Sequence, residues 1–186
     1  MSEFEFVSVL MSMVVGLGIA HLLRGVAQAV HERKQSSIDS VHMVWTAAIF
    51  LNLVLHWLVL FSWRDHDVCS FTLFLSLIGW VVALYLPVVF LYPPNKPASA
   101  GWSLVYQENR QWFMGGLACM AVADVWITFL RGDLLDPPIY LPFVGHYFVL
   151  WLSGAIIASS RYQRFLAWYT LLSLMAWALV VRRFLT

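Results

Sequence analysis

The sequence has 186 residues, of which 61% are hydrophobic and only 11% are charged. An ordinary soluble domain has about 25% charged residues, so this composition argues against a soluble globular protein. The net charge of +1, without a clustered basic stripe, argues against a nucleic-acid partner. Several stretches of about 18 residues are almost free of charge, which is typical of transmembrane helices. They are continuously apolar, which argues against the alternating strands of an outer-membrane barrel.

Six apolar segments follow one another and predict an all-α, multi-pass membrane protein with a single transmembrane domain over residues 1–186. The acidic start, MSEFEF, lacks the basic region of a cleavable signal peptide, so we expect the first segment to be retained. The expected spans are Phe6–Val30, Val41–Ser62, Cys69–Leu91, Trp112–Leu130, Pro138–Ser159 and Phe165–Leu185.

The longest connection covers residues 92–111 and separates the first three spans from the last three. Its Pro-rich first half should end the preceding helix, and residues 102–111 should form a short interfacial helix. Three spans on each side would give two halves of inverted orientation, as in many transporters. The connections leave no room for a soluble catalytic domain, so we lean against an enzyme.

Lysine and arginine counts predict the orientation of the spans. We define face A as the side that holds the N-terminus and face B as the opposite side. Seven basic residues fall on face B, namely Arg24, Arg33, Lys34, Lys96, Arg110, Arg161 and Arg164. Four fall on face A, namely Arg64, Arg131, Arg182 and Arg183. Because basic loops favour the cytoplasm, we expect a protein of the plasma or inner membrane with both termini outside.

Three ionisable residues in different spans share one expected depth. Asp124 and His56 lie about six residues, and His146 about eight, from the face-A ends of their spans. At 1.5 Å per residue, all three are roughly 9–12 Å deep. A charge there costs roughly 2.5–3.5 kcal/mol, so such residues face the interior and have partners. Asn52 shares a helix face with His56, and together the four form the candidate site.

Three chemistries suit this candidate site, beside the simpler interpretation of hydrogen bonds that hold helices together. Asp and His side chains relay protons or cations in pumps and transporters. His56 and His146 on different helices could ligate a haem b, although Asp124 would sit awkwardly beside an apolar macrocycle. The two histidines with Asp124 would also suit zinc or another divalent metal.

The first span carries a stripe of small residues, Ser8, Ser12, Gly16 and Ala20, at helical spacing. This small-xxx-small pattern lets helix backbones approach closely, within one chain or between chains, and predicts a packing face. The stripe leads to Arg24, with His21 beside it, and these two residues form a second polar level nearer face B. Arg24 can extend its charged end to the headgroups.

Three functions remain open on the sequence alone. The leading hypothesis is an oligomeric proton or cation channel, or a small transporter, because a chain this small needs several copies to enclose a pore. The second is a haem-b redox protein of the membrane. The third is a non-catalytic subunit or scaffold that binds a partner protein or lipid. Only two cysteines are present, Cys69 and Cys119, and we expect both to be reduced.

Overall fold

The computed structural model describes residues 3–34, 39–59, 71–96, 100–132, 134–135 and 137–185. These residues form helices, as the sequence predicts. The elements are α1 (Glu3–His31), the 3-10 helix η1 (Glu32–Lys34), α2 (Ser40–Val59), α3 (Phe71–Leu91), α4 (Trp102–Arg131), α5 (Tyr140–Ile156) and α6 (Ser160–Leu185). The expected ends at Ser62 and Cys69 lie outside the described residues, as does the Cys69 thiol, whereas Cys119 is a free, exposed cysteine.

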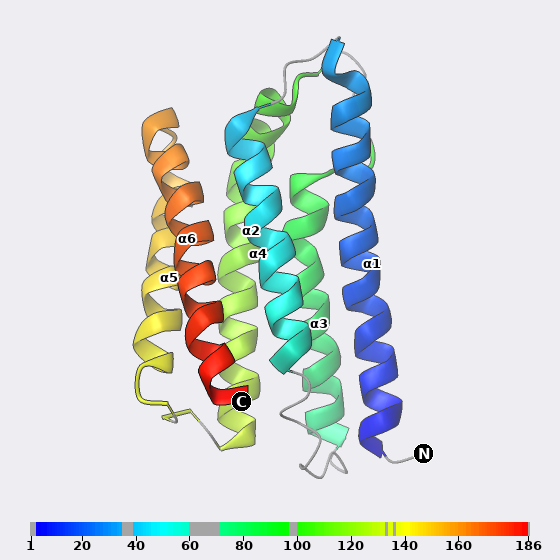
Figure 1. Cartoon of the computed structure of the whole chain (residues 1–186), viewed down its shortest axis with the longest axis vertical. Helices are drawn as coiled ribbons and strands as arrows, with labels where there is room; N and C mark the ends of the chain where they lie inside the picture. The colour runs from blue at the N-terminus through cyan, green and yellow to red at the C-terminus, as the bar shows by residue number, and fades with distance from the viewer. Residues whose placement is uncertain are drawn as a thin grey trace.

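Four of the described helices are long and apolar enough to cross a membrane: α1 from Val7 onward, α2, α3 and α4. Helix α5 is also apolar but has only 17 residues. The apolar, membrane-compatible character of the chain is therefore confirmed for these helices. Figure 1 shows the helices running up and down one bundle, with the beginning of α1 and the end of α6 at the same end.

Helix α4 is the centre of the bundle because it packs extensively on both α3 and α5 and also contacts α2. Helix α1 packs on the far side of α3, which gives a row in the order α1, α3, α4, α5. Helices α2 and α6 pack on each other and lie against this row (Figure 1). One group of helices, α2, α4, α5 and α6, thereby surrounds a common interior.

The start of α4 differs from the expectation of a separate interfacial helix before a span at Trp112. The helix begins at Trp102 and continues without a break for 30 residues. Buried Trp102, Val105 and Tyr106 lie at helical spacing and extend the buried face that continues with Phe113. A continuous apolar face favours a continuous helix. The helix ends at Gly132, which takes the left-handed conformation (φ 86°) that glycine adopts readily.

Helix α1 packs through a face beside the predicted stripe of small residues. Its buried positions are Val7, Met11, Val15, Gly18, Leu22, Gly25 and Ala29, which recur every three or four residues. In the stripe, Ser12, Gly16 and Ala20 are exposed, and a Cβ on Gly16 would meet no atom within 4 Å. Within the chain, α1 therefore packs through a face beside the stripe, whereas packing of the stripe between copies stays a prediction.

A charged contact joins the end of α1 to the loop after α3. The Nζ of Lys96 lies 2.8 Å from the Glu32 carboxylate and 4.7 Å from the centre of the Trp102 ring. The hydrogen bond from Lys96, assisted by one from Gln28, lowers the pKa of Glu32 below its ordinary value. Lys96, in the loop after α3, thus joins Glu32 to Trp102 in the first turn of α4.

Candidate functional site

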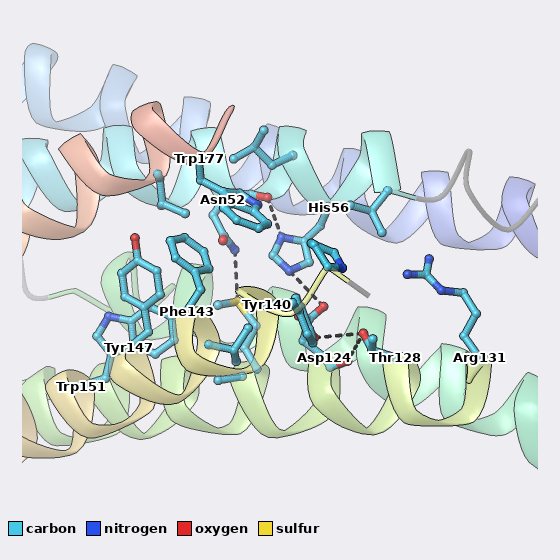
Figure 2. Close-up of a pocket in the computed structure, with 17 residues that line it drawn as sticks. Asn52, His56, Asp124, Thr128, Arg131, Tyr140, Phe143, Tyr147, Trp151 and Trp177 are labelled. Atoms are coloured by element: carbon cyan, nitrogen blue, oxygen red, sulfur yellow. Dashed lines mark hydrogen bonds and ion pairs between the residues drawn. The ribbon is translucent and has the colours of Figure 1, made fainter. Parts of the chain in front are cut away.

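A cavity of about 200 Å³ lies among α2, α4, α5 and α6, beside the turn from α4 to α5. Figure 2 shows Arg131 at one end of this cavity and Trp151 at the other. Polar side chains gather toward the Arg131 end and aromatic rings toward the Trp151 end. The cavity is large enough for several water molecules or a small ligand. Its labelled lining residues are Asn52, His56, Asp124, Thr128, Arg131, Tyr140, Phe143, Tyr147, Trp151 and Trp177.

His56 and Asp124 form the centre of the polar end, so the structure brings together two of the residues that sequence depth had paired. The Nε2 of His56 lies 3.5 Å from Oδ1 of Asp124, and both side chains are mostly buried. The Nδ1 of His56 lies 2.8 Å from the carbonyl oxygen of Asn52. A carbonyl oxygen only accepts, so Nδ1 carries the hydrogen and donates it.

This assignment fixes what Nε2 can do. A neutral imidazole has one N–H, and here it is on Nδ1, so Nε2 would present a lone pair to the carboxylate. Two lone pairs that face each other repel. A further proton on Nε2 of His56 or on Oδ1 of Asp124 converts the contact into an attractive one. The arrangement can therefore accept one further proton.

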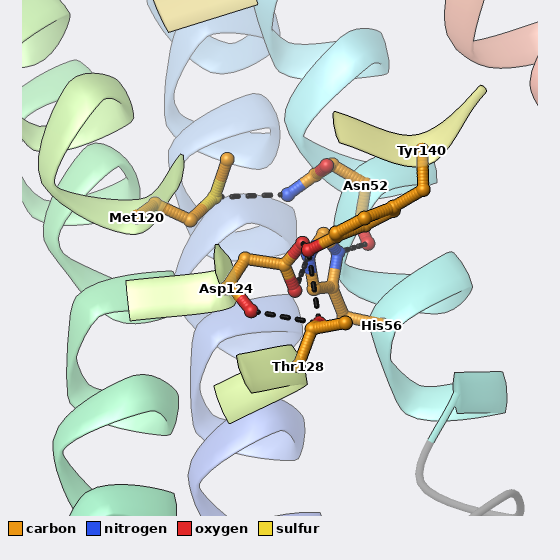
Figure 3. A network of polar contacts seen from close by, with 6 residues as sticks. All are labelled: Asn52, His56, Met120, Asp124, Thr128 and Tyr140. Atoms are coloured by element: carbon orange, nitrogen blue, oxygen red, sulfur yellow. Dashed lines mark hydrogen bonds and ion pairs between the residues drawn. The ribbon is translucent and has the colours of Figure 1, made fainter. Parts of the chain in front are cut away.

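Tyr140 and Thr128 extend the polar contacts around Asp124 (Figure 3). The Tyr140 hydroxyl lies 2.7 Å from Oδ2 of Asp124 and 2.9 Å from the Thr128 hydroxyl. The Thr128 hydroxyl donates to the backbone carbonyl of Asp124 over 2.9 Å. Two hydroxyl hydrogens cannot fill all three contacts while Asp124 is ionised. If Asp124 carries a proton on Oδ2, it donates to Tyr140, Tyr140 donates to Thr128, and all three contacts become hydrogen bonds.

The walls around the pair are apolar or weakly polar. Asn52 is buried, and its amide nitrogen donates to the sulfur of Met120 over 3.1 Å. Sulfur is a weak acceptor, so this amide is only lightly held. The Trp80 ring lies on the side of His56 that faces α3, with ring centres 5.7 Å apart.

His146 does not line this cavity. Its ring lies against those of Phe143 and Tyr147 on α5, and the Tyr169 ring on α6 is 6.0 Å away. Haem ligation by His56 would require its Nε2 to leave Asp124. Within the described residues, no three His, Cys, Asp or Glu side chains gather closely enough to hold a metal ion. The structure thus offers no support for the three-residue metal set.

The second predicted level, His21 and Arg24, lies apart from this cavity. The Nε2 of His21 lies 2.8 Å from the Tyr92 carbonyl oxygen, and Nδ1 lies 2.9 Å from the Tyr85 hydroxyl. His21 therefore donates through Nε2 and accepts through Nδ1, which satisfies a neutral ring. Arg24 is exposed beside a separate cavity of about 380 Å³ between α1 and α3. His21 holds α1 to α3 as a hydrogen-bonded packing residue.

Sequence reasoning missed Tyr140 and Thr128. Thr128 follows Asp124 by four residues and thus shares its helix face, a signal that was present in the sequence. Tyr140 begins α5, two residues after Pro138, where a tyrosine is typical of an anchor at the membrane surface. Its partner on α4 depends on how the two helices pack, which sequence spacing does not reveal.

Comparisons with known proteins leave the site to be interpreted on its own chemistry. No protein-family model, no curated protein and no solved structure matches this chain.

Proposed function

We propose that this chain is a small multi-pass membrane transport protein that binds and releases a proton or cation at His56 and Asp124. One observation carries the proposal. The hydrogen on Nδ1 of His56 is committed to the Asn52 carbonyl, so the contact between Nε2 and Asp124 needs one further proton. Buried Asp and His residues with named partners are typical of proton relays in pumps and transporters.

The proton also changes the contacts around it. When the proton is on Nε2 of His56 or on Oδ1 of Asp124, Tyr140 donates to Oδ2 of Asp124. When the proton is on Oδ2, Asp124 donates to Tyr140 and Tyr140 donates to Thr128. Tyr140 belongs to α5, whereas Asp124 and Thr128 belong to α4. Movement of the proton to Oδ2 thus alters a contact between two helices, which is what coupling of protonation to movement requires.

The closed interior beyond the cavity favours a transporter over an open channel. Toward the starts of α4 and α6, Phe113, Met114 and Leu166 are fully buried side chains at the helix interfaces. They lie between the cavity and the opposite end of the bundle along both helices. A transporter that opens to one side at a time needs such a closed layer.

The membrane arrangement that we propose has six spans in a plasma or inner membrane, with both termini outside and face B cytoplasmic. It rests on the apolar helices and on the seven-to-four distribution of basic residues. The test uses single cysteines at exposed Leu135 on face A and Ser159 on face B, after Cys69 and Cys119 are replaced by serine. An impermeant thiol reagent should label position 135 in intact cells and position 159 only after lysis. The reverse pattern would refute the orientation.

The functional test compares Asp124→Asn with Glu108→Gln in proteoliposomes that contain a pH-sensitive dye. Both variants remove one carboxylate from α4, but Glu108 is exposed and lies outside the cavity. Under an imposed pH gradient, Asp124→Asn should lower the proton flux to that of empty liposomes, whereas Glu108→Gln should retain it. Asparagine keeps the volume and hydrogen bonds, so both variants should fold. Flux that is absent in the unmodified protein, or unchanged in Asp124→Asn, would refute the proposal.

A further inference from the structure

A third cavity, of about 350 Å³, lies at the opposite end of the four helices α2, α4, α5 and α6. Its lining is largely polar and comes from the starts of α2, α4 and α6 and from the turn between α5 and α6. Figure 1 shows the starts of these three helices at one end of the bundle.

Two arginines give this cavity its positive charge. Arg110 from α4 donates one N–H to the carbonyl oxygen of Gly154 over 2.9 Å, which fixes the side chain at the cavity wall. A guanidinium has five N–H donors, so this contact uses a small part of its capacity. Arg164 comes from the second turn of α6 and is exposed. Arginine suits phosphate because its planar fork donates two parallel hydrogen bonds to one group.

The floor of the cavity is a buried chain of hydrogen bonds. The indole N–H of Trp45 donates to the Tyr106 hydroxyl over 2.9 Å, and Tyr106 donates to Oε1 of Gln163 over 2.7 Å. The amide nitrogen of Gln163 donates to the carbonyl oxygens of Gly154 and Ile157. Tyr106 and Gln163 are each 4% exposed. This chain joins α2, α4, α5 and α6, so the walls that carry the arginines are held in place before any ligand arrives.

The backbone reinforces the positive charge, and one acidic group opposes it. Helix α4 begins without a side-chain cap, so its first N–H groups and dipole favour an anion near Ser103. The long helix α6 begins at Ser160 on the same cavity. Asp39 is the acidic residue of the lining, and one of its oxygens accepts the backbone N–H of Val41 at the start of α2. Two arginines against one aspartate leave a positive balance.

We propose that this third cavity binds the phosphate group of an anionic molecule, held by Arg110 and Arg164. The site is separate from the His56–Asp124 cavity and does not depend on the proposed transport of protons. Its volume exceeds that of a lone phosphate, so it accommodates a phosphate that carries an organic group. Two sources supply this chemistry: a soluble phosphate compound and the headgroup of an anionic phospholipid.

The test uses the full chain, purified in detergent, with two probes. Pyrophosphate, titrated against the intrinsic tryptophan fluorescence, represents the soluble source. Phosphatidic acid, compared with phosphatidylcholine and detected as bound lipid by native mass spectrometry, represents the headgroup. At least one probe should bind with a dissociation constant in the millimolar range or below. Binding of pyrophosphate alone assigns a soluble ligand, and preferential retention of phosphatidic acid assigns a lipid.

A matched pair of variants separates this cavity from general attraction by charge. Arg164→Gln should weaken binding about tenfold, the effect of one lost charged hydrogen bond of roughly 1.5 kcal/mol. Arg161→Gln removes the same charge from the first turn of α6, but Arg161 does not line the cavity and should change binding less than twofold. Both side chains are exposed, so both variants should fold. If neither probe binds, or if both variants weaken binding equally, the proposal is wrong.

Discussion

At the scale of single residues, Tyr140 is the side chain that joins the ionisable pair to a neighbouring helix. It begins α5, yet its hydroxyl lies within hydrogen-bond distance of both Asp124 and Thr128 on α4. With a proton on Oδ2 of Asp124 this hydroxyl donates to Thr128, and otherwise it donates to Oδ2. The hydroxyl has a single hydrogen. When that hydrogen changes its acceptor, the protonation of Asp124 affects α5 without a large movement of the Tyr140 side chain.

Replacement of Tyr140 by phenylalanine should therefore uncouple the two helices at the site. The change leaves one oxygen of Asp124 without its donor, which should cost about 1–3 kcal/mol. We expect a lower melting temperature in detergent and a proton flux less steeply dependent on pH. Thr128→Val should reduce the stability by less than Tyr140→Phe does. The double variant should lose less stability than the sum of the two single losses, because both changes remove the contact between Tyr140 and Thr128. Additive losses would show that Tyr140 and Thr128 act separately.

The sequence predicted the depth of the site but not the rotation of its helices. His56 and Asp124 were paired because each lies about six residues inside its span, and the structure brings them together. His146 was included by the same argument, yet Tyr147, the next residue on α5, lines the cavity instead. Successive residues on a helix point about 100° apart. Apolar residues on most sides of α5 give no sign of which side faces inward.

At the scale of elements, the contact of α1 with the end of α3 depends on Gly25. A Cβ on Gly25 would lie 2.2 Å from Cδ1 of the Tyr92 ring, which real atoms do not permit. The Tyr92 hydroxyl is held by Thr46, and its ring packs on His42 and Trp102, so the ring has little freedom to move. Glycine here sets the distance between α1 and the rest of the bundle.

Gly25→Ala should consequently destabilise the protein by about 1–3 kcal/mol, the usual cost of overpacking, partly offset by alanine's better helix propensity. The matched control is Gly79→Ala on α3, where a Cβ meets nothing within 4 Å. That variant should be neutral or slightly stabilising. Unfolding of the detergent-solubilised protein, followed by tryptophan fluorescence, measures both. Equal stability of the two variants would show that α1 can shift away without cost.

The small-residue pattern of α1 shows how sequence reasoning found the right element but not the face that packs within the chain. The pattern of Ser8, Ser12, Gly16 and Ala20 is regular, but the glycines of α1 that lie against other parts of the chain are Gly18 and Gly25. The buried residues of α1 repeat at nearly the same period and begin one residue earlier, at Val7. The periodicity predicted a helix with a face that packs closely. Which face packs within the chain depends on the neighbouring helices, which the periodicity does not reveal.

At the scale of the whole molecule, the exposed stripe on α1 offers a direct test of self-association. We propose a homo-oligomer in which this stripe packs against another copy, as small residues do between membrane helices. Since Gly16 has open space around it, Gly16→Leu should leave the fold of the single chain intact. It should nevertheless reduce the oligomer size in mild detergent, as measured by light scattering. An unchanged size would indicate that lipid covers the stripe.

Neighbouring helices of very different length have a consequence for the surrounding lipid. With 30 residues, α4 is about 45 Å long, whereas the 17 residues of α5 reach only about 26 Å. A typical hydrocarbon layer is about 30 Å thick, so α4 exceeds it and α5 falls short. Tyr140, the first residue of α5, meets Thr128 rather than the end of α4. A helix shorter than the hydrocarbon layer favours local thinning of the bilayer, so we expect the lipid beside α5 to be thinner and water to approach His56 and Asp124 from that side.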